Sequence, residues 1–423
     1  MNMDAGRARP GGRHGALHRL VVLCMAVCLV LLCAHACRCQ NPPSRKIASL
    51  GQEKVLYKFG KDETVDTSMV SGVSGDRALV AWSDGSGTQA MFIDAEGRKS
   101  GQIFNVSNEK ATMLSGAARL CAGRKPKAVL LAVPTTSPVT GNKPLSIFSI
   151  NPDGSVAGEP IRLGEAGPYS KGGAIAATCK RAYVAWHTGK VGQFDVNTAA
   201  VDLETGKVIW EKTVSRPGLN AFMPSIIAGK KQVAVAWAEK KLVIGKQETG
   251  HRQGDIRLSV MDEDGRVLQE PVSVAGTFLP VYAPAIGFDG EDIVFVFKDH
   301  PDEEYRAGIY FMKTGKSGKM IVNRSRLARA DGPDSPLLLK LRDRGLATFA
   351  LRGLADDLLV GANFMGRDGA KLQRELQIYA HGMKYRNISA VLLGSSIIAV
   401  YAGCELAGCS LFSIDIDLSA VLN

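Results

Sequence analysis

The stretch Pro224–Val274 reads PSIIAGKKQVAVAWAEKKLVIGKQETGHRQGDIRLSVMDEDGRVLQEPVSV. It contains four short runs rich in Val, Ile, Ala and Leu, which are separated by a Gly-Lys-Lys turn, a long polar loop and an Asp-Glu-Asp-Gly turn. Runs of this length between turn residues are typical of antiparallel β-strands. The stretch therefore predicts one small four-stranded sheet.

Variants of this unit recur along the chain. The apolar end of the second run serves as a marker, and it is found at Trp82, Val133, Trp186, Trp237, Phe297, Phe349 and Tyr401. The steps are 51 to 53 residues long, except for one of 60 residues that contains an insertion after Glu239. Seven such units predict an all-β fold, a seven-bladed β-propeller of four-stranded antiparallel blades. An open stack of the same units is the alternative.

The two ends of the repeat region are complementary. Only LSAVLN follows Asp417, which is too short for a good fourth strand, whereas the spare run KVLYKFG at 54–60 precedes the first unit. A propeller leaves no free edges when an N-terminal segment supplies the outer strand of the last blade. We therefore expect residues 54–423 to form the propeller and KVLYKFG to close the ring.

Acidic residues followed by Gly end the third run of most units, as in DAEG at 94–97 and DEDG at 262–265. Asp and Asn side chains accept hydrogen bonds from their own backbone in turns, and Gly supplies a positive φ. We expect hairpin turns here. Calcium loops would need more oxygen ligands at alternate positions, so no metal site is predicted.

The first 39 residues have the pattern of a targeting segment. Basic residues precede the apolar run Leu20–Ala34, and Ala34-His35-Ala36 offers the small residues that signal peptidase prefers. The apolar run is shorter than the about 20 residues of a bilayer span. We expect a signal peptide at 1–36, a polar tether at 37–53, and export to the periplasm or cell envelope.

Cys37 directly follows Ala36, and this junction resembles the lipobox of bacterial lipoproteins. The resemblance implies that Cys37 carries acyl chains that tether the protein to a membrane. Cleavage without lipidation and an uncleaved anchor are the alternatives.

Four cysteines lie in the repeat region. Cys121 and Cys179 end the first strand of neighbouring units, and Cys404 and Cys409 stand on the two arms of one hairpin. An exported compartment permits disulfides, so we expect each of these pairs to form one where the Cα atoms are close enough. Four buried free thiols are the alternative.

The formal net charge is +11, and about +7 remains for residues 40–423. Blocks of Lys and Arg dense enough for nucleic acid are absent from the sequence. A mildly basic exported protein suits an envelope protein or an anionic polymer as partner, although the excess charge can also serve solubility alone. We expect membrane contact only through an N-terminal lipid or anchor, and no cofactor.

Propeller topology assigns each loop to one of two faces. Loops from second to third strands and links between blades share one face, which we call the loop-rich face, and this sequence makes most of them long. Long loops on a rigid scaffold carry function, so we place the ligand site there, with no catalytic residue assigned. The candidate ligand-binding residues are Tyr169, His187, Arg216, Phe222, His251, Tyr282, His300, Arg326, Arg329, His381, Tyr385 and Arg386.

The nonapeptide DLETGKVIW at 202–210 resembles the repeat of quinoprotein-type propellers. That family includes dehydrogenases that bind pyrroloquinoline quinone and non-catalytic propellers of outer-membrane protein assembly. The resemblance implies a turn at Thr205-Gly206 and a Trp210 side chain docked between blades, and it bears on the fold rather than on a cofactor. More broadly, the units resemble the repeat propellers of bacterial envelope proteins.

Two functions remain open at this stage. The first is a non-catalytic, envelope-tethered propeller that binds a protein or an anionic polymer through its loop-rich face. The alternative is a propeller enzyme, a quinoprotein dehydrogenase or a glycan hydrolase or lyase, with its site at the channel mouth. The enzyme needs two of the histidines, or one histidine and a carboxylate such as Asp299, within hydrogen-bond reach of each other.

Overall fold

The computed structural model describes residues 48–59, 67–74, 76–119, 127–136, 141–167, 172–190, 192–217, 219–240, 254–277, 282–299, 307–329, 335–352, 359–373, 375–378, 384–405 and 408–418. Met1–Arg45 lie outside these residues. All described elements are β-strands, so the described part of the chain holds no helix that could span a bilayer.

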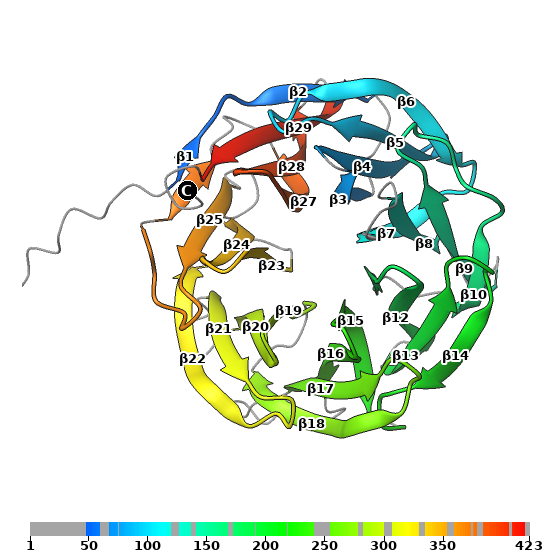
Figure 1. The fold of residues 1–423 in the computed structure, drawn as a ribbon, viewed down its shortest axis with the longest axis vertical. Coiled ribbons are helices and arrows are strands. Elements are labelled where there is room, and N and C mark those ends of the chain that lie inside the picture. Colours follow the sequence, from blue (N-terminus) through cyan, green and yellow to red (C-terminus); the bar gives the residue numbers. More distant parts are fainter. Residues whose placement is uncertain are drawn as a thin grey trace, which may run out of the picture. The chain divides into compact units, whose positions relative to one another are not determined.

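Seven antiparallel sheets follow one another around a ring, which confirms the predicted propeller (Figure 1). Blades 1 and 2 contain β3 (Thr67–Ser74), β4 (Arg77–Asp84), β5 (Gly87–Ile93), β6 (Lys99–Ser107), β7 (Ala111–Arg119), β8 (Lys127–Pro134), β9 (Lys143–Ile150) and β10 (Ile161–Ala166). Blades 3 and 4 contain β11 (Gly173–Ala177), β12 (Arg181–Lys190), β13 (Gln193–Asp202), β14 (Val208–Thr213), β15 (Asn220–Ala228), β16 (Gln232–Lys240), β17 (Gly254–Asp262) and β18 (Val267–Thr277). Blades 5 and 6 contain β19 (Ala285–Asp289), β20 (Asp292–Asp299), β21 (Gly308–Thr314), β22 (Met320–Arg329), β23 (Leu337–Leu341), β24 (Gly345–Arg352), β25 (Leu359–Met365) and β26 (Leu376–Ile378).

Blade 7 is completed by both ends of the repeat region. Its three C-terminal strands are β27 (Lys384–Leu393), β28 (Ser396–Glu405) and β29 (Gly408–Asp417). The strand β2 (Lys54–Lys58) pairs antiparallel with β29, as predicted, and the short strand β1 (Ser49–Leu50) extends this pairing. The N-terminal segment therefore supplies the outer edge of the last blade and closes the ring.

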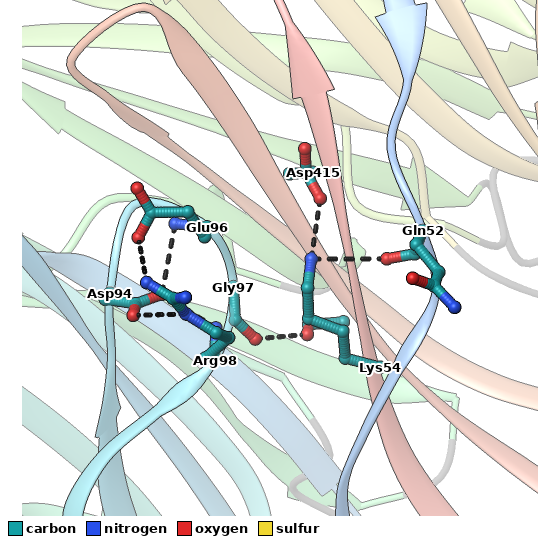
Figure 2. A network of polar contacts seen from close by, with 8 residues as sticks. Gln52, Lys54, Asp94, Glu96, Gly97, Arg98 and Asp415 are labelled. Carbon is teal, nitrogen blue, oxygen red and sulfur yellow. Dashed lines mark hydrogen bonds and ion pairs between the residues drawn. The ribbon is translucent and has the colours of Figure 1, made fainter.

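Side chains at the closure join β2 to β29 within blade 7 and blade 7 to blade 1 (Figure 2). Lys54 Nζ donates to Asp415 Oδ1 at 2.7 Å, and Ser413 Oγ donates to the carbonyl oxygen of Gly97 in the turn between β5 and β6. The same turn is capped by Asp94, whose Oδ1 accepts from two backbone N–H groups. Closure thus combines strand pairing with contacts between neighbouring blades.

The acidic-Gly turns between third and fourth strands also join blades. Gly265 has a φ of 81°, and a Cβ there would lie 2.7 Å from the Trp210 ring of blade 3. Gly369 has a φ of 83° and packs in the same way on Phe311 of blade 5. The positive φ and the close approach of the ring both favour Gly at these positions. The prediction of hairpin turns is therefore confirmed. The same turns also fix the spacing of neighbouring blades.

The hydrophobic core lies between blades, where each sheet packs against its neighbours. Trp82, Trp186 and Trp237 are almost fully buried in these layers, as their position in the repeat predicts. Trp210 donates from Nε1 to the carbonyl of Glu263 at 3.1 Å, so it docks between blades 3 and 4 as expected. A rigid wheel results, and its two faces carry the ends of the strands.

Candidate functional site on the loop-rich face

The strand directions decide which side chains reach the loop-rich face. Second and fourth strands end there, and third strands begin there, because every neighbouring pair is antiparallel. The opposite side carries the first and third hairpin turns, and we call it the tight-turn face. Two-residue loops also occur on the loop-rich face, at 85–86, 191–192 and 406–407, so its long loops are concentrated in the other blades.

Buried carboxylates recur at one position of the repeat. Asp84, Glu239 and Asp299 each stand two residues after the aromatic marker of a second strand, and none is more than 2% exposed. A charge removed from water is costly unless it is paired and hydrogen-bonded. Each of these groups therefore needs partners, and the partners differ between the blades.

The carboxylate of Asp84 accepts hydrogen bonds from its own hairpin. Its Oδ2 accepts from Trp82 Nε1 at 3.2 Å, and its Oδ1 accepts from the backbone N–H of Ser86 at 2.8 Å and from the Ser86 hydroxyl at 2.6 Å. These bonds close the tight turn between β4 and β5, in the sequence WSDGSGT at 82–88.

Asp299 is neutralised by an arginine from the outer strand of its blade. Arg324 Nη2 donates to Asp299 Oδ2 at 2.6 Å, and Arg324 Nη1 donates to the carbonyl of Gly276 in blade 4 at 3.4 Å. The guanidinium carbon lies 3.9 Å from the centre of the Tyr310 ring, which itself stacks on Phe297 at 6.0 Å. A cation over an aromatic face and beside a carboxylate is held in one orientation, and it joins blades 4 and 5.

Further cations lie at the same end of blade 5. Arg326 lies opposite Tyr310 in the strand register and donates to the carbonyl of Ala307 at 3.4 Å, while Arg329 ends β22 with its side chain exposed. Lys298, which is 7% exposed, places its ammonium 4.3 Å from the centre of the Tyr282 ring. Blade 5 thus gathers four cations and one carboxylate among the described residues at its loop-rich end.

Blade 4 carries a second buried ion pair. Arg257 lies 2.9 Å from Glu239 Oε1 and 3.2 Å from Asp255 Oδ2. All three side chains are largely buried, and two carboxylates share one guanidinium. This cluster is acidic overall, so the sign of the charge changes between neighbouring blades.

His187 is the one predicted histidine within the described ranges. It is 2% exposed, its Nδ1 accepts from the backbone N–H of Met223 at 3.4 Å, and its ring meets Phe194 edge-on at 5.0 Å. Met223 has a φ of 51°, which a residue with a Cβ rarely adopts. His187 therefore helps to hold a strained bend of β15 against blade 3.

The other predicted site residues are placed as follows. Tyr169, His251, His300 and His381 lie outside the described residues. Phe222, Arg326, Arg329, Tyr385 and Arg386 were expected on loops, and this was wrong, because β15, β22 and β27 extend further towards the loop-rich face. Arg216 does lie in a loop, exposed, and donates to the carbonyl of Pro271 at 3.4 Å. Tyr282 and Arg326 are brought to the same end of blade 5, whereas His187 and Phe222 lie between blades 3 and 4.

Sequence reasoning missed Arg324, Tyr310, Lys298, Arg257 and Glu239. The carboxylates had a visible signal, an acidic residue two positions after the marker in the sequences Trp-Ala-Glu at 237–239 and Phe-Lys-Asp at 297–299. Arg257 and Arg324 had no such signal. Their carboxylate partners Glu239 and Asp299 lie 18 and 25 residues away in sequence, on other strands.

One charge cluster on the tight-turn face is a contact between blades. Asp289, which is almost fully buried, receives Lys313 Nζ at 2.9 Å and lies 2.5 Å from Arg367 Nε of blade 6. Burial opposes ionisation of Asp289, but the hydrogen bonds from Lys313 and Arg367 outweigh it and hold the pKa of that carboxyl below its ordinary value. In the same pair, burial opposes the charge of Lys313, and the bonds to Asp289 and Asp292 nevertheless raise its pKa.

The predicted disulfide of blade 7 is present. Cys404 and Cys409 face each other in the register of β28 and β29 and form a bond between their Sγ atoms. Cys179 is also disulfide-bonded, and its predicted partner Cys121 lies outside the described residues, as does Cys37. Within the ranges that the structure describes, no group of three or more His, Cys, Asp or Glu side chains is arranged to hold a metal ion.

No protein-family model matches the chain, and no curated protein sequence matches it. The quinoprotein-type repeat thus remains a resemblance in one blade. Solved structures do match in shape. An ulvan lyase of polysaccharide lyase family PL25 superimposes with a TM-score of 0.52 at 8% identity, over 86% of this chain and 95% of that one.

Two further structures give lower scores. The polysaccharide lyase Uly1 has a TM-score of 0.49 at 10% identity, over 90% of this chain and 95% of that one. The β-propeller domain of the Trilobed protease from Pyrococcus furiosus has a TM-score of 0.45 at 13% identity, over 84% of this chain and 96% of that one. At these identities the likeness is one of fold, and the chain is a seven-bladed β-propeller.

Proposed function

We propose that this propeller binds an anionic polymer, in particular an acidic polysaccharide, at the loop-rich end of blade 5. The observation that supports this most is the set of cations around Tyr310. Arg324 is held against the ring, Arg326 lies beside it, and Arg329 is exposed at the end of the same strand. Guanidinium groups bind carboxylate and sulfate oxygens in pairs.

Among the described residues, the exposed charge at this end of blade 5 favours an anion. Arg326 and Arg329 are exposed, whereas Asp299 is fully buried and already paired with Arg324. An anionic chain that reaches the end of β22 therefore meets two exposed guanidinium groups. The exported, envelope-tethered location that the N-terminal sequence predicts belongs to the same proposal, since acidic polymers are common components of cell envelopes.

Binding is preferred to cleavage because of the position of His187. A general base must lie within hydrogen-bond reach of the proton that it removes. His187 is almost fully buried, and its Nδ1 already accepts a backbone hydrogen bond from blade 4. Its described contacts hold two blades together, so the enzyme alternative would need one of the predicted histidines outside the described ranges.

The test compares two charge reversals of equal size. Arg326→Glu combined with Arg329→Glu changes the loop-rich end of blade 5, and Lys230→Glu combined with Lys231→Glu changes two exposed residues of the tight-turn face. Binding to polygalacturonate and to dextran sulfate is measured by affinity electrophoresis, with neutral dextran as the blank. We expect the arginine variant to lose retardation by both anionic polymers and the lysine variant to keep it.

Equal loss in the two variants would show that only net charge matters, and unchanged binding in the arginine variant would reject the site. Polygalacturonate is also incubated with the protein and followed by ultraviolet absorbance, because a lyase would leave an unsaturated uronate that absorbs there. A rise in absorbance would favour the lyase alternative over simple binding.

A further inference from the structure

Exposed apolar side chains recur at the start of the outer strands. They form the pairs Val208-Ile209 in β14, Val267-Leu268 in β18 and Met320-Ile321 in β22, and each side chain is between 36% and 56% exposed. All three pairs follow the third turn of their blades, so they lie along one sector of the rim on the tight-turn face. Soluble proteins expose single apolar residues commonly, but repeated neighbouring pairs on one rim indicate a contact surface.

Each pair is preceded by an exposed cation, namely Lys207, Arg266 and Lys319. Blade 6 continues the pattern with Lys371-Leu372, both exposed. Exposed acidic residues stand on both sides of the pairs, in the turns before them and at Glu211 and Glu270, two residues after them. One acidic residue of the turns, Asp264, is paired with Arg181 at 3.0 Å. Apolar side chains with a Lys or Arg beside them are the composition of surfaces that rest in the headgroup region of a bilayer, where the apolar atoms enter and the cation meets phosphate.

The N-terminal segment enters the propeller at the same edge. Ser49 pairs with Asp417 at the end of β29, and the backbone N–H of Ala48 donates to Gln373 Oε1 at 3.0 Å, one residue after Leu372. Cys37 precedes Ala48 by 11 residues, which span at most about 40 Å when fully extended. A chain anchored at Cys37, or by the apolar run Leu20–Ala34, would therefore keep this edge close to the bilayer.

We propose that the tight-turn rim of blades 3 to 6, defined by these apolar residues and cations, rests on a phospholipid bilayer. The loop-rich face then points away from the membrane, where a soluble or cell-wall polymer can reach blade 5. The rim contact adds to the predicted N-terminal tether and orients the wheel.

The test uses the full chain in vesicles of phosphatidylethanolamine and phosphatidylglycerol, with or without bromine on the acyl chains as a fluorescence quencher. The chain has four Trp residues, and Trp82, Trp186 and Trp237 are almost fully buried, so Trp210→Phe provides the background signal. In that background, Leu268→Trp places a probe on the rim, and Arg329→Trp places a matched probe at the loop-rich end of the neighbouring outer strand. We expect brominated lipid to quench the rim probe and to leave the probe at 329 unchanged.

Quenching of neither probe, or equal quenching of both, would overturn the proposal, and the thermal unfolding midpoint of each variant shows that it is folded. A fluorescence blue shift of the rim probe that grows with protein concentration in the absence of vesicles would also overturn it, because a second copy of the chain would then cover the rim. Further replacement of Lys207, Arg266 and Lys319 by Glu is expected to abolish the quenching of the rim probe.

Discussion

Arg324 donates a 2.6 Å hydrogen bond from Nη2 to Oδ2 of Asp299, a carboxylate with no exposed surface. The two residues stand 25 positions apart, at the end of β20 and in the outer strand β22. The pair is the centre of the proposed binding site, and it also fixes the outer strand against the aromatic layer of blade 5.

Arg324→Met is expected to lower the free energy of unfolding by about 3 kcal/mol, because it leaves the charge of Asp299 buried without its partner. The side chain of Arg324 is 24% exposed, which places the loss at the lower end of the range for buried pairs. Chemical denaturation followed by tryptophan fluorescence measures it. The double variant Asp299→Asn, Arg324→Met should recover much of the loss, and failure to recover it would mean that the arginine acts by packing on Tyr310 instead.

Gly265→Ala is expected to destabilise the protein by about 2 kcal/mol, since the new Cβ would be strained at a φ of 81° and would lie 2.7 Å from the Trp210 ring. Thermal unfolding measures the effect. In a Trp210→Ala background only the backbone strain should remain, so the cost of Gly265→Ala should fall. An unchanged cost in that background would show that the indole does not limit the approach of blades 3 and 4.

The fold was predictable from the sequence because one apolar marker and one acidic-Gly turn recur at a fixed period. The closing strand at Lys54–Lys58 was predictable as well, since the last unit lacks a fourth run and the chain before the first unit offers one. The site was less predictable. Whether Arg326 lies on a strand or a loop depends on how far β22 continues its pairing with β21, and local sequence does not determine that.

The replacement of both Cys404 and Cys409 by Ser is expected to cost about 2 kcal/mol, because the bond closes a loop of only six residues and therefore restricts the unfolded chain little. The hairpin of β28 and β29 should persist, since ten residue pairs hold its register. Urea unfolding of the double variant and of the wild type, both without reductant, measures the difference, because reductant would also break the disulfide of Cys179. A loss above about 4 kcal/mol would indicate that the bond also stabilises the ring closure on β2.

Asp289→Asn is expected to destabilise the protein at neutral pH by about 3 kcal/mol, since Lys313 and Arg367 would lose their shared carboxylate. Because the pKa of Asp289 is lowered in the folded state, its contribution is fully present above the unfolded pKa of 3.8 and is lost as the pH falls through the lower folded value. The difference between wild type and variant should thus be constant from pH 7 to pH 5 and should shrink below about pH 4. Asp343→Asn makes the same chemical change at an exposed turn of blade 6, and its unfolding free energy should follow the wild type at every pH. A difference for Asp289→Asn that persists unchanged at low pH would show that the carboxylate is held by packing and not by its charge.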